Sequence, residues 1–417
     1  MSYHSRLLGI AAAAVLFGGP ALAADCEVTH WWTSGGEAAA VAEFAKALDA
    51  DGQDKWVDGA IGGSGDTSRP IIISRIQGGN PPCATQFNPG TDADALIDAG
   101  LLTDLSDLAA KEGWADFVYP KTQFDPTCVR NGKVWCVPVN IHSGFWMWIN
   151  RHVYEDNGLA VPKTWDDVVA TAPQLREKGI IPISLAQGWP VSTLSDALEV
   201  SVLGIPNFVA IYKDRNLDVA KGPESRAVWE KLDQARQLVD PQEMVPQWND
   251  AVSLVITGKA GANVMGDWAQ GEFAVANMVA GKDYDCLIGL GFNPIVSTGG
   301  DVFYFPKQAD QAATDAQLRL ASLMISAPVQ VAFNLKKGSM PIRQDVDLNA
   351  ANACMKIGLE AMSNADNIVP NNAQMMLRED IYRIRDLRNE FFTDKTMTVD
   401  EAFDQFVNII ETAAPVN

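Results

Sequence analysis

Short runs of β-branched and aromatic residues alternate with longer amphipathic stretches along the first part of the chain. The runs at 26–32 (CEVTHWW), 56–63 (WVDGAIGG) and 83–88 (CATQFN) have the composition of strands. Residues 37–48 and 73–79 separate these runs and carry apolar side chains at helical spacing. Strands that alternate with helices predict an α/β architecture with mostly parallel sheets.

Farther along the chain the pattern favours helices. An extended segment at 137–150 (VPVNIHSGFWMWIN) separates the first α/β block from a second, more helical block. The chain has 417 residues, too many for one hydrophobic core, so we expect two domains that meet near this segment. Helical periodicity predicts helices over 94–101, 105–112, 165–178 (with Thr164 as N-cap), 223–239, 317–325, 350–362 and 399–413.

The N-terminus has the three parts of a secretory signal peptide. Arg6 supplies positive charge, residues 7–17 form a short apolar run, and Ala21 and Ala23 place small residues before a cleavage point. We therefore expect residues 1–23 to be a signal peptide that is cleaved after Ala23. This leader predicts a periplasmic protein.

Charge narrows the range of partners. The formal net charge is −20 and no basic block occurs, which argues against nucleic acid and anionic lipid. After the leader, no run of about 18 residues lacks a charged side chain, so no membrane-spanning helix is expected. The acidity suits an exported protein but names no ligand.

Six cysteines in an exported chain favour disulfides over metal binding. One pair flanks Asn131-Gly132, a hairpin-turn signal, and another pair opens two strand-like runs that neighbouring strands would bring together. No C-x-x-C occurs and the four histidines show no ligand spacing, so no metal is expected. The inferred pairs are Cys128–Cys136, Cys26–Cys83 and, as the remaining pair, Cys286–Cys354.

Motifs of the common catalytic sites are absent. The chain has no H-E-x-x-H, no phosphate-binding G-x-x-x-x-G-K-[ST] and no G-x-S-x-G. Residues 61–66 (IGGSGD) lack the third glycine of a dinucleotide loop, so we interpret them as a strand-to-helix loop and expect no cofactor. Glu37, Asp92, Asp267 and Asp301 leave a glycosidase-type carboxylate pair open, because sequence does not give their separation.

Tryptophans beside small polar residues suggest a binding site. Trp31 and Trp32 precede T-S-G-G-E, Trp189 follows Gln-Gly, and Trp268 follows Gly-Asp. An indole face covers the apolar face of a sugar ring, while charged and amide groups pair with its hydroxyls. Each such hydrogen bond contributes about 1 kcal/mol net. The tryptophans that we expect in the core are Trp56, Trp114, Trp135, Trp165, Trp229 and Trp248.

These motifs belong to a longer ordered set. As a set they resemble the extracellular sugar-binding proteins of ABC importers, and within that family the glucose/mannose-binding group. The resemblance extends over essentially the whole chain after the leader. The motifs, in order, are WWTSGGE (31–37), GGSGD (62–66), VPVNIH (137–142), GDW (266–268), GD (300–301) and FNLKKGSMPIR (333–343).

The resemblance implies a two-lobed periplasmic-binding-protein fold of α/β class, helix-rich, with a hinge between the lobes and the ligand in the cleft. The first lobe would comprise 24–139 and 300–342, and the second 140–299 and 343–417. A non-enzymatic monomer is expected, which hands a small carbohydrate to the membrane permease subunits of an importer and binds no nucleic acid.

The resemblance also assigns ligand contacts. Trp31, Trp32 and Glu37 would lie at the cleft entrance, and Trp189 and Trp268 would stack on the ring from the second lobe. Asp301 and Lys337 would bind hydroxyls, whereas Arg343 would be structural. The full expected set is Trp31, Trp32, Glu37, Gln86, Asn88, His142, Phe145, Trp189, Asp267, Trp268, Asp301, Lys337 and Gln374.

Three positions depart from the glucose-binding pattern. Asn88 replaces a basic residue, Phe145 replaces an asparagine, and Gln374 replaces a histidine. Each change alters a polar partner in the expected cleft, so a hexose other than glucose, a modified sugar, a polyol and a small glycoside stay open. A periplasmic glycoside-processing enzyme is the alternative function. A peptide or opine ligand would require a stronger charged complement than Lys337 and Asp301.

Overall fold

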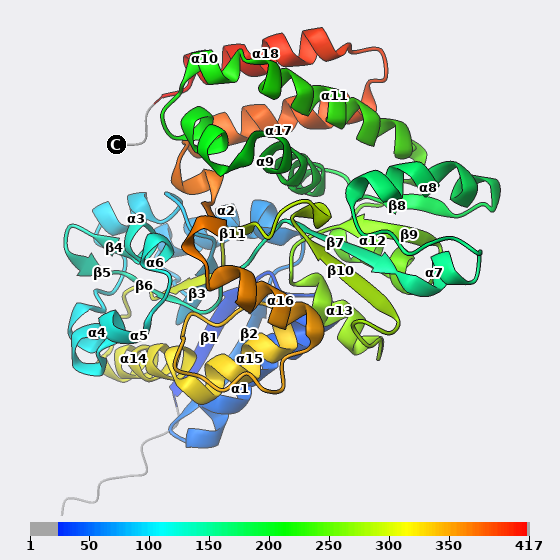
Figure 1. The fold of residues 1–417 in the computed structure, drawn as a ribbon. Coiled ribbons are helices and arrows are strands. Elements are labelled where there is room, and N and C mark those ends of the chain that lie inside the picture. The colour runs from blue at the N-terminus through cyan, green and yellow to red at the C-terminus, as the bar shows by residue number, and fades with distance from the viewer. Residues whose placement is uncertain (1–23, 415–417) are drawn as a thin grey trace, which may run out of the picture.

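The computed structural model describes residues 24–414, and two main sheets organise them (Figure 1). The strand order in the five-stranded sheet is β2-β1-β3-β12-β6. β1 pairs in parallel with β2 and β3, whereas β12 runs antiparallel to β3 and β6. The bounds are β1 Ala24–His30, β2 Asp54–Ala60, β3 Ala84–Phe87, β6 Cys136–Pro138 and β12 Val302–Tyr304. The three strands predicted at the start of the chain are confirmed.

Helices pack on this sheet to form the first lobe. Its core contains Val28, Phe44, Phe87, Phe303 and Phe333. Phe44 and Phe333 stack with ring centroids 4.3 Å apart, which joins α1 to α15 over the sheet. The elements are α1 Gly35–Asp51, α2 Ser64–Gln77, α3 Asp94–Asp98, α4 Ser106–Glu112, α5 Trp114–Phe117, α6 Lys121–Cys128, β4 Val129–Arg130, β5 Lys133–Val134, α14 Gln311–Ile325 and α15 Ala327–Lys337.

The second lobe is built on a four-stranded sheet with the order β10-β7-β9-β8. A layer of helices, α9, α10, α11, α17 and α18, lies above this sheet at the top of Figure 1, whereas α8 and α12 pack on its strands. The elements are β7 Trp146–Asn150, α7 Arg151–Glu155, α8 Trp165–Glu177, β8 Ile181–Ser184, α9 Trp189–Tyr212, α10 Leu217–Ala220, α11 Pro223–Leu238, α12 Trp248–Ile256, β9 Ala260–Val264, α13 Ala269–Val275, β10 Tyr284–Ile288, α17 Arg378–Thr393 and α18 Val399–Thr412. Two α/β lobes of high helix content confirm the predicted fold class. The prediction of mostly parallel sheets is wrong, because β7 and β12 each run antiparallel to both of their neighbours and make the sheets mixed.

Helix α9 is long and apolar enough to cross a membrane by length and composition, but half of its most apolar stretch is buried in the protein. It breaks at Gly204, whose φ is 70°. Asp196 and Glu199 on α9 pair with Arg388 of α17. A broken helix that carries two paired carboxylates into the protein interior is a core helix of the second lobe.

Three extended segments cross between the lobes side by side. The amide of Ile141 and the carbonyl of Met340 pair at 2.8 Å, and His142 and Gly299 exchange two backbone hydrogen bonds of 3.0 Å. The amide of Val139 donates to the carbonyl of Asp301 at 3.0 Å. The predicted lobe boundaries after residues 139, 299 and 342 fall in or beside these segments, and the exact limits of the lobes stay a prediction.

Local predictions are confirmed in detail. All three inferred disulfides are present, with the last one tying β10 to α16 (Ala353–Met362). Thr164 caps α8 in a reciprocal capping box with Asp167. Two short strands, β11 (Val296–Thr298) and β13 (Ile368–Pro370), pair in parallel near the lobe junction. The predicted leader, residues 1–23, and its cleavage site lie outside the described residues.

Candidate functional site

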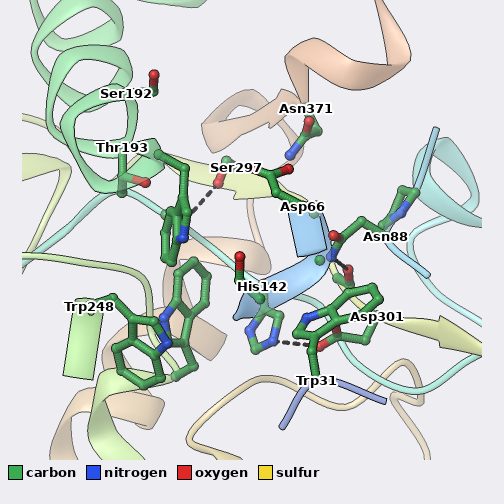
Figure 2. A pocket seen from close by; sticks show the side chains of 18 of the residues that line it. Trp31, Asp66, Asn88, His142, Ser192, Thr193, Trp248, Ser297, Asp301 and Asn371 are labelled. Carbon is green, nitrogen blue, oxygen red and sulfur yellow. Dashed lines mark hydrogen bonds and ion pairs between the residues drawn. The ribbon is translucent and has the colours of Figure 1, made fainter. Parts of the chain in front are cut away.

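A cavity of about 520 Å³ lies between the two lobes, and residues from both lobes line it. In Figure 2, Trp31, Asn88 and Asp301 lie on one side of this space, Thr193 and Trp248 lie on the other, and His142 lies between them. The cavity is therefore the cleft that two-lobed folds present at their junction. Expected site residues that line it are Trp31, Trp32, Glu37, Asn88, His142, Phe145, Trp189, Trp268, Asp301 and Lys337.

The first-lobe wall follows directly from the end of β1. The amide of Trp31 donates to Oε1 of Gln86 on β3 at 3.0 Å, which fixes the chain where it leaves the sheet. Trp32 is 2% exposed and packs against Phe303 and Phe333, with ring centroids 5.6 and 5.3 Å away. Trp32 is thus largely a core residue with one edge at the cleft, whereas Trp31 has more of its surface free for a ligand.

Lys337 and Glu37 form a buried ion pair at the base of this wall. Lys337 Nζ lies 2.6 Å from Oε1 of Glu37, and the ammonium sits 5.3 Å from the centroid of Trp32. Burial raises the pKa of Glu37, while the ammonium of Lys337 acts in the opposite direction. Lys337 is the last residue of α15, and Gly338 ends that helix in the left-handed conformation. The end of α15 therefore places a buried ammonium group at the wall of the cleft.

His142 forms the floor of the cleft on the first crossing segment. Its Nδ1 lies 2.6 Å from Oδ1 of Asp267, and its Nε2 lies 2.8 Å from Oδ2 of Asp301. Gln86 and Asn140 donate side-chain hydrogen bonds to Asp301 at 2.6 and 3.0 Å. Both ring nitrogens face carboxylates, which is the partner set of an imidazolium.

The charges in the floor support this assignment. Burial opposes the charge on His142, but Asp267 and Asp301 hold the pKa of its imidazole above the ordinary value. Burial also opposes the charge on Asp301, yet His142 and Lys337 keep the pKa of that carboxyl below its ordinary range. Asp267 is fully buried, and burial raises its pKa. The floor therefore presents one cation held between two acidic side chains.

The second-lobe wall is aromatic. The ring centroid of Trp268 lies 6.0 Å from that of Trp189, 6.5 Å from that of Trp248 and 4.9 Å from that of His142. A Cβ at Gly266 would come within 2.0 Å of the Trp268 indole, so the G-D-W motif requires glycine there. Trp248, expected only in the core, is buried and also lines the cleft. Trp248 and Trp268 are 20 residues apart in the sequence, so no local pattern predicted that their rings lie close together.

Three expected contacts do not line the cavity. Gln86 and Asp267 lie behind it, where they hold Trp31, Asp301 and His142 in place. Gln374 donates to the hydroxyl of Thr127 at 3.2 Å, while Asn371, three residues earlier, lines the cleft. The expected roles of these side chains in ligand binding stay predictions.

Sequence reasoning missed a charged set at the rim. Arg69 on α2 and Arg378, Tyr382 and Arg385 on α17 line the same cavity. The α17 residues are spaced four and three apart, which places them on one helix face. This spacing could have predicted that the three side chains share one helix face, but nothing in the sequence shows that this face contacts α2.

The site chemistry favours binding over catalysis. Glu37 pairs with Lys337, Asp301 with His142 and Asp92 with Arg378, so the candidate acids already have cationic partners. Among the described residues, no group of three His, Cys, Asp or Glu side chains is placed to hold a metal ion. Facing indoles above a polar floor suit a ring-shaped solute that carries hydroxyls. Fold and site together define a two-lobed solute-binding protein.

Known proteins place the chain in a family. Residues 30–356 match the bacterial extracellular solute-binding protein family, and the chain belongs to it. It is 36% identical over 348 residues to a probable sugar-binding periplasmic protein of Rhizobium meliloti, with 82% of each chain covered. A similarly described protein of Mesorhizobium japonicum is 34% identical over 98% of this chain and 99% of its own. The structure of a chitin oligosaccharide binding protein, 17% identical, shares the fold with a TM-score of 0.74 over 94% of this chain and 99% of that one.

Proposed function

We propose that this protein captures a sugar in the periplasm and delivers it to the permease subunits of an ABC importer, without catalysis. The ligand we propose is a monosaccharide of hexose type. The single observation that carries this proposal is the pair of indole walls, Trp31 from the first lobe and Trp189 with Trp268 from the second, on either side of a buried polar floor. Sugar-binding proteins among the relatives support it.

Each part of the cleft suits one part of such a ligand. A ring that enters between Trp31 and Trp189 would lose contact with water on its apolar faces. Its hydroxyls would meet the carboxylates of Asp301 and Glu37 and the ammonium of Lys337, where hydrogen bonds to charged groups contribute about 1.5–3 kcal/mol each. Both lobes contribute, so the proposed ligand stabilises the closed arrangement of the lobes.

The finer preference within the glucose/mannose group would depend on Asn88 and Phe145. Asn88 lies at the rim, where its amide donates to the carbonyl of Gly300 at 3.2 Å. Phe145 is 7% exposed and lines the cleft with apolar surface. An apolar surface at that position favours a sugar face that lacks a hydroxyl, because a buried hydroxyl without a partner is costly.

A thermal-shift screen of the chain without its leader tests the proposal. Hexoses, pentoses, polyols and disaccharides are added singly, and a ligand at a hundredfold excess over Kd stabilises the protein by about 2.7 kcal/mol. We expect a clear upward shift of Tm with at least one monosaccharide. Trp31→Ala and Trp189→Ala should abolish the shift, because each removes one aromatic wall.

Trp135→Phe is the matched control, since this indole lies in the first lobe away from the cleft and bonds the carbonyl of Arg130. It should keep the full shift. No shift with any carbohydrate would contradict the proposed function. A shift with disaccharides alone would keep a sugar ligand but contradict the monosaccharide.

A further inference from the structure

Five charged side chains, Asp66, Arg69, Asp92, Arg378 and Arg385, meet at the rim of the cleft; we call them the rim cluster. Asp66 stands in the first turn of α2 and accepts from Arg69 of the same helix at 2.8 Å. The same carboxylate lies 2.6 Å from Nη1 of Arg385 on α17. Asp66 thus pairs with one arginine from each side of the cleft.

Asp92 repeats this arrangement deeper in the rim. Its side chain is only 11% exposed and lies 2.5 Å from Nε of Arg378 and 3.3 Å from Nε of Arg69. The guanidinium groups of Arg385 and Arg378 lie 4.3 and 6.0 Å from the ring centroid of Tyr382. The hydroxyl of Tyr382 lies 3.3 Å from Asp66 and 3.4 Å from Arg69.

Helix α17 is fixed to the second lobe, so these contacts bridge the lobes. Leu387 and Phe391 lie in the core of the second lobe. Arg388 is 2% exposed and pairs with Asp196 and Glu199 of α9. Because α17 cannot follow α2 when the lobes separate, opening of the cleft must break the pairs of Asp66 with Arg385 and of Asp92 with Arg378.

The rim cluster does not have the character of an anion-binding site. Each carboxylate already holds one arginine from each lobe, and Arg69 directs its remaining donor at Oδ1 of Asn88, 3.1 Å away. A ligand carboxylate would have to displace one of these partners. Ion pairs that join the lobes account for the cluster without an acidic ligand.

We infer that Asp66 and Asp92 form a charged clamp with Arg385 and Arg378 that retains the ligand by holding the lobes together. Arg69 is a positioning residue at the centre of the clamp. Its guanidinium lies 5.7 Å from the ring of Trp31 and bonds Asn88, so lobe closure and the first-lobe wall are coupled. This inference rests on the proposed function, because it concerns release of the sugar rather than its identity.

Stopped-flow tryptophan emission tests the clamp with D-glucose, D-galactose and D-mannose as probes. In the double variant Asp66→Asn/Asp92→Asn, the dissociation rate should rise about tenfold, because two partly buried pairs across the cleft are lost. Raising the salt from about 0.05 to about 0.5 M should accelerate release from the wild type but not from the variant. Equal dissociation rates for the two proteins, or equal salt dependence, would overturn the clamp.

Asp98→Asn is the matched control. Asp98 pairs with Arg130 at 3.1 Å inside the first lobe, so its loss removes one of the two negative charges that the double variant removes, without touching the rim. It should release the probe at the wild-type rate, and an acceleration as large as in the double variant would contradict the clamp. If the double variant does not fold, Arg385→Gln removes the second-lobe partner of Asp66 and carries the same expectation, severalfold smaller.

Small-angle scattering separates failure of the clamp from failure of the proposed function. If no monosaccharide of the thermal-shift screen binds the wild type, the monosaccharide proposal fails, but the clamp still predicts that salt increases the wild-type radius of gyration toward that of the double variant. If the wild type and the double variant have the same radius of gyration at every salt concentration, the clamp is overturned independently of any ligand.

Discussion

At the scale of single residues, His142 connects both lobes through one ring. Asp267 precedes α13 in the second lobe, and Asp301 precedes β12 in the first, yet both carboxylates reach the same imidazole. The pKa of His142 lies above its ordinary value, so the folded protein binds the proton more tightly than the unfolded chain. A raised pKa stabilises the fold fully below the unfolded value of about 6.5 and less as pH rises through the folded value.

His142→Gln should therefore lower the free energy of unfolding by about 3 kcal/mol at mildly acidic pH, because two buried carboxylates lose their shared cation. The difference from the wild type should shrink as pH rises from about 6 to about 9. Urea unfolding across this range measures it. A difference that does not change with pH would show that the imidazole is neutral in the folded protein.

At the scale of elements, the lobes meet behind the site through glycines. A Cβ at Gly36 would come 2.5 Å from the carbonyl carbon of Gly271, which shows how closely the start of α1 approaches α13. Oε1 of Glu272 on α13 accepts from the amide of Gly36 at 2.8 Å. The neighbouring residues Glu37 and Trp268 line the cleft, so this contact sets the distance between the two walls.

Gly36→Ala should destabilise the protein by about 1–3 kcal/mol, because the backbone of α13 must move away. It should also weaken sugar binding, since the walls would no longer close on the ring. Gly35→Ala is the control, because a Cβ there meets nothing closer than 3.6 Å. Tm and the Kd for sugar are measured for both variants. If Gly36→Ala and Gly35→Ala have the same Tm and the same Kd, the contact between Gly36 and Gly271 does not set the distance between the walls.

The elements that sequence predicted best are those with local causes. Amphipathic spacing gave α11 and α18 within one or two residues of their observed ends, and the capping side chain of Thr164 marked the start of α8. The start of α2 was missed, because Gly62 and Gly63 with Pro70 inside the helix weakened its pattern. A hydrogen bond from Arg385 to Asp66 joins residues 319 positions apart, and no local pattern encodes such a pairing.

At the scale of the whole molecule, each lobe is assembled from separated parts of the chain. β12 lies between β3 and β6 in the five-stranded sheet, although all four strands of the second sheet come before it in the sequence. α17 and α18 return to the second lobe near the C-terminus. This exchange forces three crossing segments through the junction, and the candidate binding residues His142 and Asp301 lie on two of them. The resemblance of motifs predicted lobes that each comprise two separate segments, whereas chain length alone predicted only two domains.

Because each lobe has its own hydrophobic core, the structure predicts how a ligand should act on the molecule. A sugar held between Trp31 and Trp189 contacts both lobes, so it should slow amide hydrogen exchange in α2 and β3 of the first lobe and in α9 and α17 of the second. At a hundredfold excess over Kd, sub-global openings that separate the lobes should cost about 2.7 kcal/mol more, which corresponds to about hundredfold slower exchange. Exchange followed by mass spectrometry, with α14, which does not line the cleft, as an internal reference, measures this. Protection confined to one lobe would place the ligand on a single wall and would contradict a binding mode in which both indole walls close on the sugar.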